Sequence, residues 1–160
     1  MYHFTPDPNQ TKPELYRELA ESAAALVAGE PDTVANMANL AALIWQFVPR
    51  LNWAGFYRVQ GQELVLGPFQ GRAACIRIPF GQGVCGTAAA SGETQLVTDV
   101  HAFPGHIACD AASRSELVVP VIRDGTVIAV IDLDSPELAR FDAEDASGME
   151  FLAAAISAAI

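Results

Sequence analysis

Residues 116–134 read ELVVPVIRDGTVIAVIDLD and contain the pattern that decides the fold. Branched apolar residues fill two short runs, Glu116 to Ile122 and Thr126 to Asp132, with Arg123-Asp124-Gly125 between them. Asp-Gly between two such runs is a strong signal for a tight turn that joins antiparallel strands. The stretch therefore predicts a β-hairpin.

Three carboxylates accompany this hairpin. Asp132 and Asp134 are two positions apart, so both point to one face of the second strand. Glu116 begins the first strand, and the hairpin brings it to the same edge. Three carboxylates around one pocket would attract an ammonium group and raise one another's pKa, which leaves one of them able to donate a proton. For Asp134, a solvated strand end is an equally good interpretation.

Further strands are predicted upstream, where short runs are rich in aromatic and branched residues and glycines separate them. They cover Trp53 to Val59, Glu63 to Phe69, Ala74 to Ile78 and Gln95 to Asp99. Residues 81–91 predict a loop that leads into a short alanine-rich helix. Residues 100–113 predict a long loop, a kind of segment that in compact domains is usually functional or disordered.

Helical spacing of apolar residues flanks the strands at both ends of the chain. A capping box at Thr11 begins a first helix, Asp32 caps a second, and Asp142 caps a last one. We expect residues 1–160 to form a single domain, with residues 1–10 as an extended lead-in. The element order predicts an α+β domain, with about six strands in one antiparallel sheet and the helices packed on one face.

Composition narrows the function classes. The 160 residues are 51% hydrophobic and 18% charged, which excludes a disordered chain. The net charge of -10 argues against nucleic acid and against anionic membranes as partners. No export signal or membrane span is visible, and three cysteines do not suit a disulfide scaffold. We therefore expect a cytoplasmic protein with reduced thiols.

The cysteines are Cys75, Cys85 and Cys109, all in the middle of the chain. Each cysteine taken alone could equally well be a small apolar residue of the core, with no chemical role. Cys85 lies in GQGVCG, where a helix N-terminus would favour its thiolate. Cys109 lies in the long loop, three residues after His106, and a neighbouring imidazolium could lower its pKa.

Two other uses of these residues are weaker. A zinc site could use His106 and Cys109 as one pair of ligands, with Cys75 and Cys85 completing four. However, Cys75 and Cys85 are ten positions apart, and structural zinc sites typically use pairs two to four residues apart, so we expect no metal. An acyl-transfer dyad of Cys109 with His106 or His101 would need a third group and an oxyanion hole. Two or three thiols in one cytosolic domain indicate a thiol redox cycle instead.

Trp53 and Tyr57 are four positions apart in NWAGFY, so they share one face of a strand with Gly55 between them. The pair would suit an apolar or sulfonium-like head as an aromatic wall. On strand pattern alone, an ordinary place in the core is favoured.

Several longer motifs are specific enough to indicate a family. The runs NWAGFY, LGPFQG, IPFGQGVCGTAA, DVHAFPGHIACD, SRSELVVPV and VIDLDSP resemble those of free methionine-(R)-sulfoxide reductases, a GAF-domain family that acts on the free amino acid. The resemblance covers nearly the whole chain. The string FPGHIACD and the cysteine spacing are far more specific than a general GAF pattern. The family fold implies a six-stranded antiparallel sheet with helices on one face, often in a homodimer.

The resemblance implies roles for the thiols. Cys109 would attack the sulfoxide sulfur, and Cys85 would be the resolving thiol that closes a disulfide with Cys109. Cys75 would be auxiliary in resolution or dispensable. Electrons would come from thioredoxin, with NADPH upstream, and no cofactor would be bound.

The resemblance also implies the substrate contacts. Glu116, Asp132 and Asp134 would bind the ammonium group of free methionine sulfoxide and protonate its sulfoxide oxygen. Trp53 and Tyr57 would contact the methyl end and the backbone of the amino acid. A non-catalytic GAF module that binds a small ligand or senses redox state is the alternative, because this fold hosts many ligands.

Overall fold

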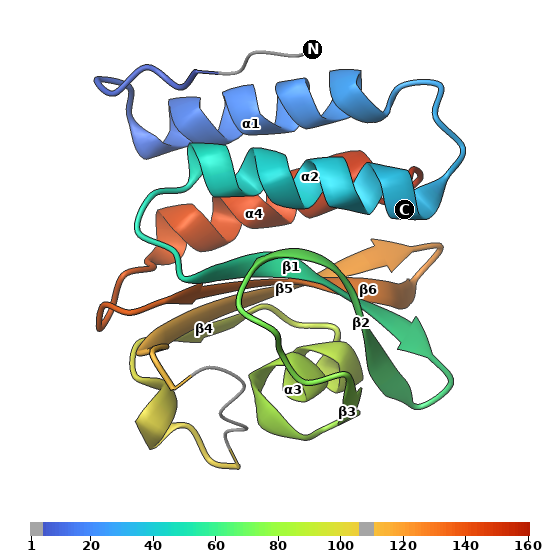
Figure 1. The fold of residues 1–160 in the computed structure, drawn as a ribbon, viewed down its shortest axis with the longest axis vertical. Helices are drawn as coiled ribbons and strands as arrows, with labels where there is room; N and C mark the ends of the chain where they lie inside the picture. The colour runs from blue at the N-terminus through green and yellow to red at the C-terminus, as the bar shows by residue number, and fades with distance from the viewer. Residues whose placement is uncertain (1–4, 106–110) are drawn as a thin grey trace.

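The structure is a computed structural model that describes residues 5–105 and 111–160 (Figure 1). Its helices and strands follow one another along the chain as α1 (Lys12–Val27), α2 (Thr33–Phe47), β1 (Trp53–Gln60), β2 (Glu63–Gly71), β3 (Arg77–Pro79), α3 (Gly83–Ser91), β4 (Gln95–Val97), the single 3-10 turn η1 (Val100–Ala102), β5 (Ser115–Arg123), β6 (Thr126–Ser135) and α4 (Ala143–Ile156). The expected order of elements is confirmed over these residues.

One six-stranded sheet organises the domain. Its strands lie in the order β3-β2-β1-β6-β5-β4, and every neighbouring pair is antiparallel. Helices α2 and α4 pack on one face, and α1 lies over them in an outer layer (Figure 1). The short helix α3 covers the opposite face. The expectation of helices on one face therefore holds for the three long helices and is wrong for α3.

The strand alternation explains why the sheet has two apolar faces. On one side of β1 and β5, Phe56 and Leu117 face the long helices. On the other side, Trp53, Tyr57 and Val118 belong to a second apolar cluster with α3. On this second face, α3 packs directly against β5 and β6.

The hairpin predicted from the sequence is present. Arg123 pairs with Thr126, so Asp124 and Gly125 form a two-residue loop. Both have positive φ, 51° and 76°, which is the requirement of a type I′ turn. The register of β5 against β6 then shifts by one residue between Val121 and Ile122, and this shift decides which side chains meet at the far end of the hairpin.

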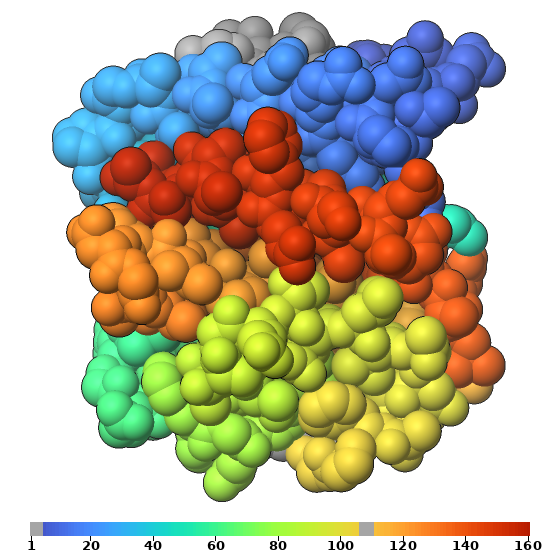
Figure 2. Space-filling view, turned by 180° about the vertical axis from the view of Figure 1, so that it is seen from behind, coloured from blue at the N-terminus to red at the C-terminus, as the bar shows by residue number. Residues whose placement is uncertain are grey.

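Helix α1 is attached to α4 by buried polar contacts. The hydroxyl of Tyr16 donates to Asp145 Oδ1 at 2.7 Å, and Lys12 Nζ lies 2.7 Å from Asp145 Oδ2. Arg140 pairs with the same carboxylate at 3.3 Å. Figure 2 shows α4 directly beneath α1 and above the β5–β6 hairpin. The outer helix is thus held by Asp145 as well as by apolar packing.

Gly148 allows this close approach of the two helices. A Cβ atom added there would lie 2.2 Å from Tyr16 Cγ and 2.6 Å from Tyr16 Cβ, so the Tyr16 ring would have to move. We expect Gly148→Ala to lower the free energy of unfolding by about 1 to 3 kcal/mol, as overpacking does, despite the better helix propensity of alanine. Urea denaturation checks this, with Ser147→Ala as the neighbouring control; equal stability of the two variants would contradict it.

Strand β3 begins later than expected. The structure has Arg77–Pro79 as the strand, whereas the sequence favoured Ala74 to Ile78. Cys75 therefore lies on the connection before β3 and is half-buried. Within the described ranges, no helix combines the length and apolar character needed to span a membrane.

Candidate functional site

The register of the hairpin places the acidic residues together. Glu116 pairs with Asp134 across β5 and β6, and Asp132 pairs with Val118. Glu116 and Asp132 are therefore diagonal neighbours on the face that α3 covers. On its other side, Asp132 lies opposite Gly55 of β1. The expected meeting of the three carboxylates at one edge of the hairpin is confirmed for these backbone positions.

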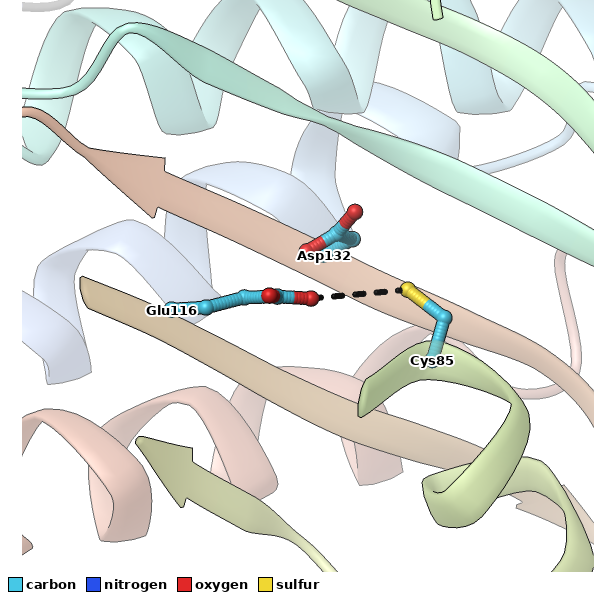
Figure 3. A group of neighbouring side chains, drawn as sticks. All are labelled: Cys85, Glu116 and Asp132. Carbon is cyan, nitrogen blue, oxygen red and sulfur yellow. Dashed lines mark hydrogen bonds between the residues drawn. The ribbon is translucent and has the colours of Figure 1, made fainter. Parts of the chain in front are cut away.

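Cys85 completes the cluster from α3. It is the third residue of that helix, and its thiol donates a hydrogen bond to Glu116 Oε1 at 3.9 Å (Figure 3). One ligand atom each of Cys85, Glu116 and Asp132 lies within 4.8 Å of the others. The three residues are only 4%, 6% and 6% exposed. We call this group the Cys85 cluster.

Glycines bring α3 this close to the sheet. A Cβ atom on Gly86 would lie 2.4 Å from the carbonyl oxygen of Pro79. The amide of Gly81 donates to the carbonyl of Gly86 at 2.8 Å and closes the loop before the helix. Gly83 has a φ of 61°, which other residues rarely adopt. The motif GQGVCG therefore positions the Cys85 side chain over β5 and β6.

Burial controls the protonation of the two central carboxyls. Burial, followed by the charges of Asp132 and Asp134, raises the pKa of Glu116 well above its usual value. Burial also raises the pKa of Asp132 to about 6, although hydrogen bonds from Cys85 and Glu116 oppose the rise. Burial thus favours the protonated form of both carboxyls.

The thiol of Cys85 behaves differently from the expectation. Burial raises its pKa well above the usual value, and the charges of Asp132 and Glu116 raise it further. The predicted thiolate at the helix N-terminus is therefore wrong for Cys85. Burial and the nearby carboxylates disfavour the Cys85 thiolate more than the helix dipole favours it. At an exposed helix end the dipole contributes only about 1 kcal/mol or less.

Asp132 should destabilise the fold at neutral pH. Its pKa rises from 3.8 unfolded to about 6 folded, so the folded state holds more protons between these values and stability falls as pH rises from about 4 to 6. Below that window the penalty is absent, and above it the penalty is complete at about 3 kcal/mol or less. We expect Asp132→Asn to raise the melting temperature at pH 7.5 and to flatten this dependence.

The measurement is thermal unfolding of Asp132→Asn and of the unchanged protein at pH 4, 5, 6 and 7.5. Asp124→Asn is the control, because Asp124 is exposed in the hairpin turn, where asparagine also fits. A variant equally destabilised at every pH would show that Asp132 is stabilising and would refute this electrostatic account.

The aromatic pair is buried beside the carboxylates. Trp53 and Tyr57 share a face and stack, with ring centroids 5.8 Å apart, and both are almost fully buried. The indole of Trp53 donates to the carbonyl of Arg72 at 3.1 Å, and the Tyr57 hydroxyl donates to the carbonyl of Cys75 at 3.0 Å. Burial, followed by the charge of Asp132, raises the pKa of Tyr57. Their contact with a substrate stays a prediction.

Phe69 is a member of this wall that the sequence did not single out. Its ring stacks on Trp53 at 5.1 Å and 14°. Phe69 pairs with Gly55 across β1 and β2, and a Cβ atom on Gly55 would lie 2.4 Å from Phe69 Cβ. The signal in the sequence is Gly55 between Trp53 and Tyr57, which leaves room for a large side chain on the neighbouring strand. Identifying that side chain as Phe69 requires knowing how β1 pairs with β2.

Asp134 lies at the edge of the cluster. It is half-buried, and it pairs with Trp53 across β1 and β6. Its charge contributes to the raised pKa of both Glu116 and Cys85. Asp134 is therefore close enough to act electrostatically on the site, which goes beyond a purely solvated strand end.

The thiols do not pair as expected. Cys85 is free, so the predicted disulfide between Cys85 and Cys109 is absent from this structure. Cys75 is disulfide-bonded. The physical reason lies in the site, because the Cys85 thiol is enclosed and hydrogen-bonded to Glu116. Cys109 and His106 lie outside the described residues, so their predicted roles stay predictions.

Three comparisons relate the chain to known proteins. The family model for the GAF domain matches residues 31–160. The free methionine-R-sulfoxide reductase of Escherichia coli K12 is 50% identical over 143 residues, which are 89% of this chain and 87% of that protein. The family-model match covers the whole β-sheet and the Cys85 cluster.

Two solved structures show the same architecture. Free methionine-R-sulfoxide reductase from Neisseria meningitidis, in complex with its substrate, is 48% identical with a TM-score of 0.91 and covers 98% of this chain and 95% of that one. A candidate GAF sensor protein from Burkholderia vietnamiensis is 60% identical with a TM-score of 0.90 and covers 94% and 96%. The chain belongs to the GAF-domain family, among its free methionine-R-sulfoxide reductases.

Proposed function

We propose that this protein reduces free L-methionine-(R)-sulfoxide to methionine. The observation that carries the proposal is a buried carboxyl group, Glu116, which lies beside the Cys85 thiol on the same sheet face as Asp132 and whose pKa is raised by burial. A sulfoxide oxygen is a poor leaving group until it is protonated, so the reaction needs such an acid. The names of relatives about 50% identical to this chain support the same activity.

The thiol cycle begins at Cys109. Its thiolate attacks the sulfoxide sulfur while Glu116 donates a proton to the oxygen. The protonated oxygen is then transferred from the substrate sulfur to the Cys109 sulfur as the bond between the two sulfurs breaks. This leaves Cys109 as a sulfenic acid, oxidised by two electrons, and releases methionine, whose sulfur is reduced by two electrons. A second thiol then attacks the sulfenic sulfur, which releases water and forms a disulfide.

We assign the second thiol to Cys75 in place of Cys85. Cys75 is half-buried and disulfide-bonded, which supports a role in exchange. Cys85 is enclosed and free, and burial keeps its thiol protonated, so it is a poor nucleophile. A dithiol such as thioredoxin, with NADPH upstream, would reduce the disulfide in a reducing compartment such as the cytoplasm. Association as a homodimer stays a prediction.

Cys75→Ser separates these two thiols. We expect it to release about one methionine per chain and then stop when thioredoxin is the reductant, because Cys109 stays a sulfenic acid. Cys85→Ser should continue for many turnovers, since serine keeps a hydroxyl donor toward Glu116. Quenched-flow counting of methionine per chain measures both. Continued turnover in Cys75→Ser together with a single turnover in Cys85→Ser would return the resolving role to Cys85.

The carboxylates select the free amino acid. Asp132 and Asp134 supply negative charge that suits an ammonium group, which methionine sulfoxide loses inside a peptide. Comparing free methionine-(R)-sulfoxide with its N-acetyl derivative therefore tests the proposal. We expect kcat/KM to fall by about 100-fold or more for the N-acetyl compound, as loss of a buried ion pair implies. Equal rates would contradict the assignment of the pocket.

A second candidate is a GAF module that binds a ligand without catalysis. The similarity to a candidate GAF sensor protein favours it. Calorimetry with free methionine sulfoxide, followed by analysis of the recovered ligand, separates the two. Saturable binding with unchanged sulfoxide in the presence of reductant would favour the sensor.

A further inference from the structure

The Cys85 cluster has the donor set of a metal site. It offers one sulfur and two carboxyl oxygens, which come from α3, β5 and β6 and lie within 4.8 Å of one another (Figure 3). The proposed reduction uses the carboxyl groups for proton transfer and ammonium binding, and it leaves the thiol of Cys85 without a chemical step.

A second observation points to a missing partner. Oδ1 of Asp132 is buried and has no hydrogen-bond partner among the residues that the structure describes. Asp132 is 94% buried, and a buried carboxylate oxygen without a partner costs free energy. A cation bound beside Asp132 and in reach of Oδ1 would give this oxygen a partner.

We propose that the Cys85 cluster, when Cys85 is reduced, binds a thiophilic divalent cation of the Zn²⁺ or Cd²⁺ type. A sulfur ligand selects such ions over Mg²⁺ and Ca²⁺, which prefer six or more oxygens. Three protein ligands leave a fourth position open, as in zinc sites that exchange water. Because the ion would occupy the place of the ammonium group, it should inhibit the reductase competitively.

The geometry needs little adjustment. Zinc bound at about 2.3 Å to sulfur and 2.0 Å to oxygen in a tetrahedron holds these atoms about 3.5 Å apart. Cys85 Sγ and Glu116 Oε1 are 3.9 Å apart. The three ligand atoms all lie within 4.8 Å of one another, so side-chain rotations of up to about 1.3 Å would close the site, and the ion would replace protons on Cys85 and Glu116.

Cadmium titration of a double variant tests the binding alone. Cys75→Ser combined with Cys109→Ser leaves Cys85 as the one cysteine of the chain's three. Under anaerobic, thiol-free conditions, we expect an ultraviolet sulfur-to-cadmium charge-transfer band that saturates at about one Cd²⁺ per chain, as a single three-ligand site implies. Adding Cys85→Ser should abolish the band.

Two further substitutions on this background show whether the carboxylates are ligands. Asp132→Asn and Glu116→Gln should each weaken Cd²⁺ binding by about tenfold or more. The matched control is Asp124→Asn, which should leave it unchanged. Absence of the band, or a band unaffected by both carboxylate substitutions, would overturn the proposal.

Competition in the unchanged reduced protein tests the inhibitory role, which rests on the proposed reductase function. Zn²⁺ should raise KM for free methionine-(R)-sulfoxide and leave kcat unchanged. A lower kcat with unchanged KM would overturn competition at the ammonium site. Because the double variant lacks Cys109, its Cd²⁺ titration judges the metal site even if the protein proves inactive as a reductase.

Discussion

Replacing Cys109 by serine should lower the turnover of free methionine-(R)-sulfoxide by about 1,000-fold or more, as removal of a nucleophile does in other enzymes. A serine hydroxyl stays protonated at neutral pH and cannot accept the oxygen as a sulfenic acid. Methionine formation over time, with excess dithiothreitol as reductant, measures the loss. Dithiothreitol makes the result independent of thioredoxin.

Substrate binding is the control for Cys109→Ser. The variant should still bind free methionine-(R)-sulfoxide in a calorimeter, because the Cys85 cluster and the aromatic wall are unchanged. Full activity in this variant would refute Cys109 as the nucleophile. Loss of both binding and thermal unfolding cooperativity would instead identify a folding defect, and Cys109→Ala should then be used.

Glu116→Gln should produce the second large effect. We expect kcat to fall by about 100-fold to 1,000-fold, in the range that general acids contribute. Glutamine keeps the size of the side chain but cannot donate a proton to the sulfoxide oxygen. Glu21→Gln on the exposed surface of α1 is the control. Activity within a factor of about two of the unchanged protein would remove Glu116 from the role of acid.

The pH dependence of the reductase activity gives this prediction a direction that can be measured. Glu116 must be protonated, so activity should fall as pH rises through its raised pKa. Asp132 must be ionised to hold the ammonium group, so activity should also fall as pH drops below about 6. Because the two carboxyls interact, the acidic and alkaline limbs of the pH profile report apparent pKa values of the pair and not of either group alone. In Glu116→Gln the alkaline limb should disappear.

The hairpin shows how far sequence patterns can predict a site. Asp124-Gly125 indicates the turn, but counting back from it pairs Glu116 with Leu133. A register shift of one residue between Val121 and Ile122 brings Glu116 opposite Asp134 instead, so local pattern predicts the hairpin but not the grouping of the carboxylates. Trp53 and Tyr57 share a face because strand side chains alternate, and this is predictable from the sequence. Features with a fixed period or a demanding turn type are predictable from the sequence.

Cys85 shows where such reasoning fails. Its motif predicts a helix N-terminus, and the structure has one, but the pKa depends on carboxylates that reach it from β5 and β6. The helix was also expected with the others on one face, whereas it covers the opposite one. Neither the face that a short helix chooses nor its neighbours across the sheet follow from local pattern, because long-range packing decides both.

The most direct test of the proposed function is incubation with racemic free methionine sulfoxide and dithiothreitol, with both epimers followed by chiral chromatography. The account predicts that the R epimer disappears, that methionine appears in equal amount, and that consumption stops at about half of the total because a fixed acid and nucleophile accept one epimer. Equal consumption of both epimers, or of neither while the thiols titrate as reduced, would contradict it.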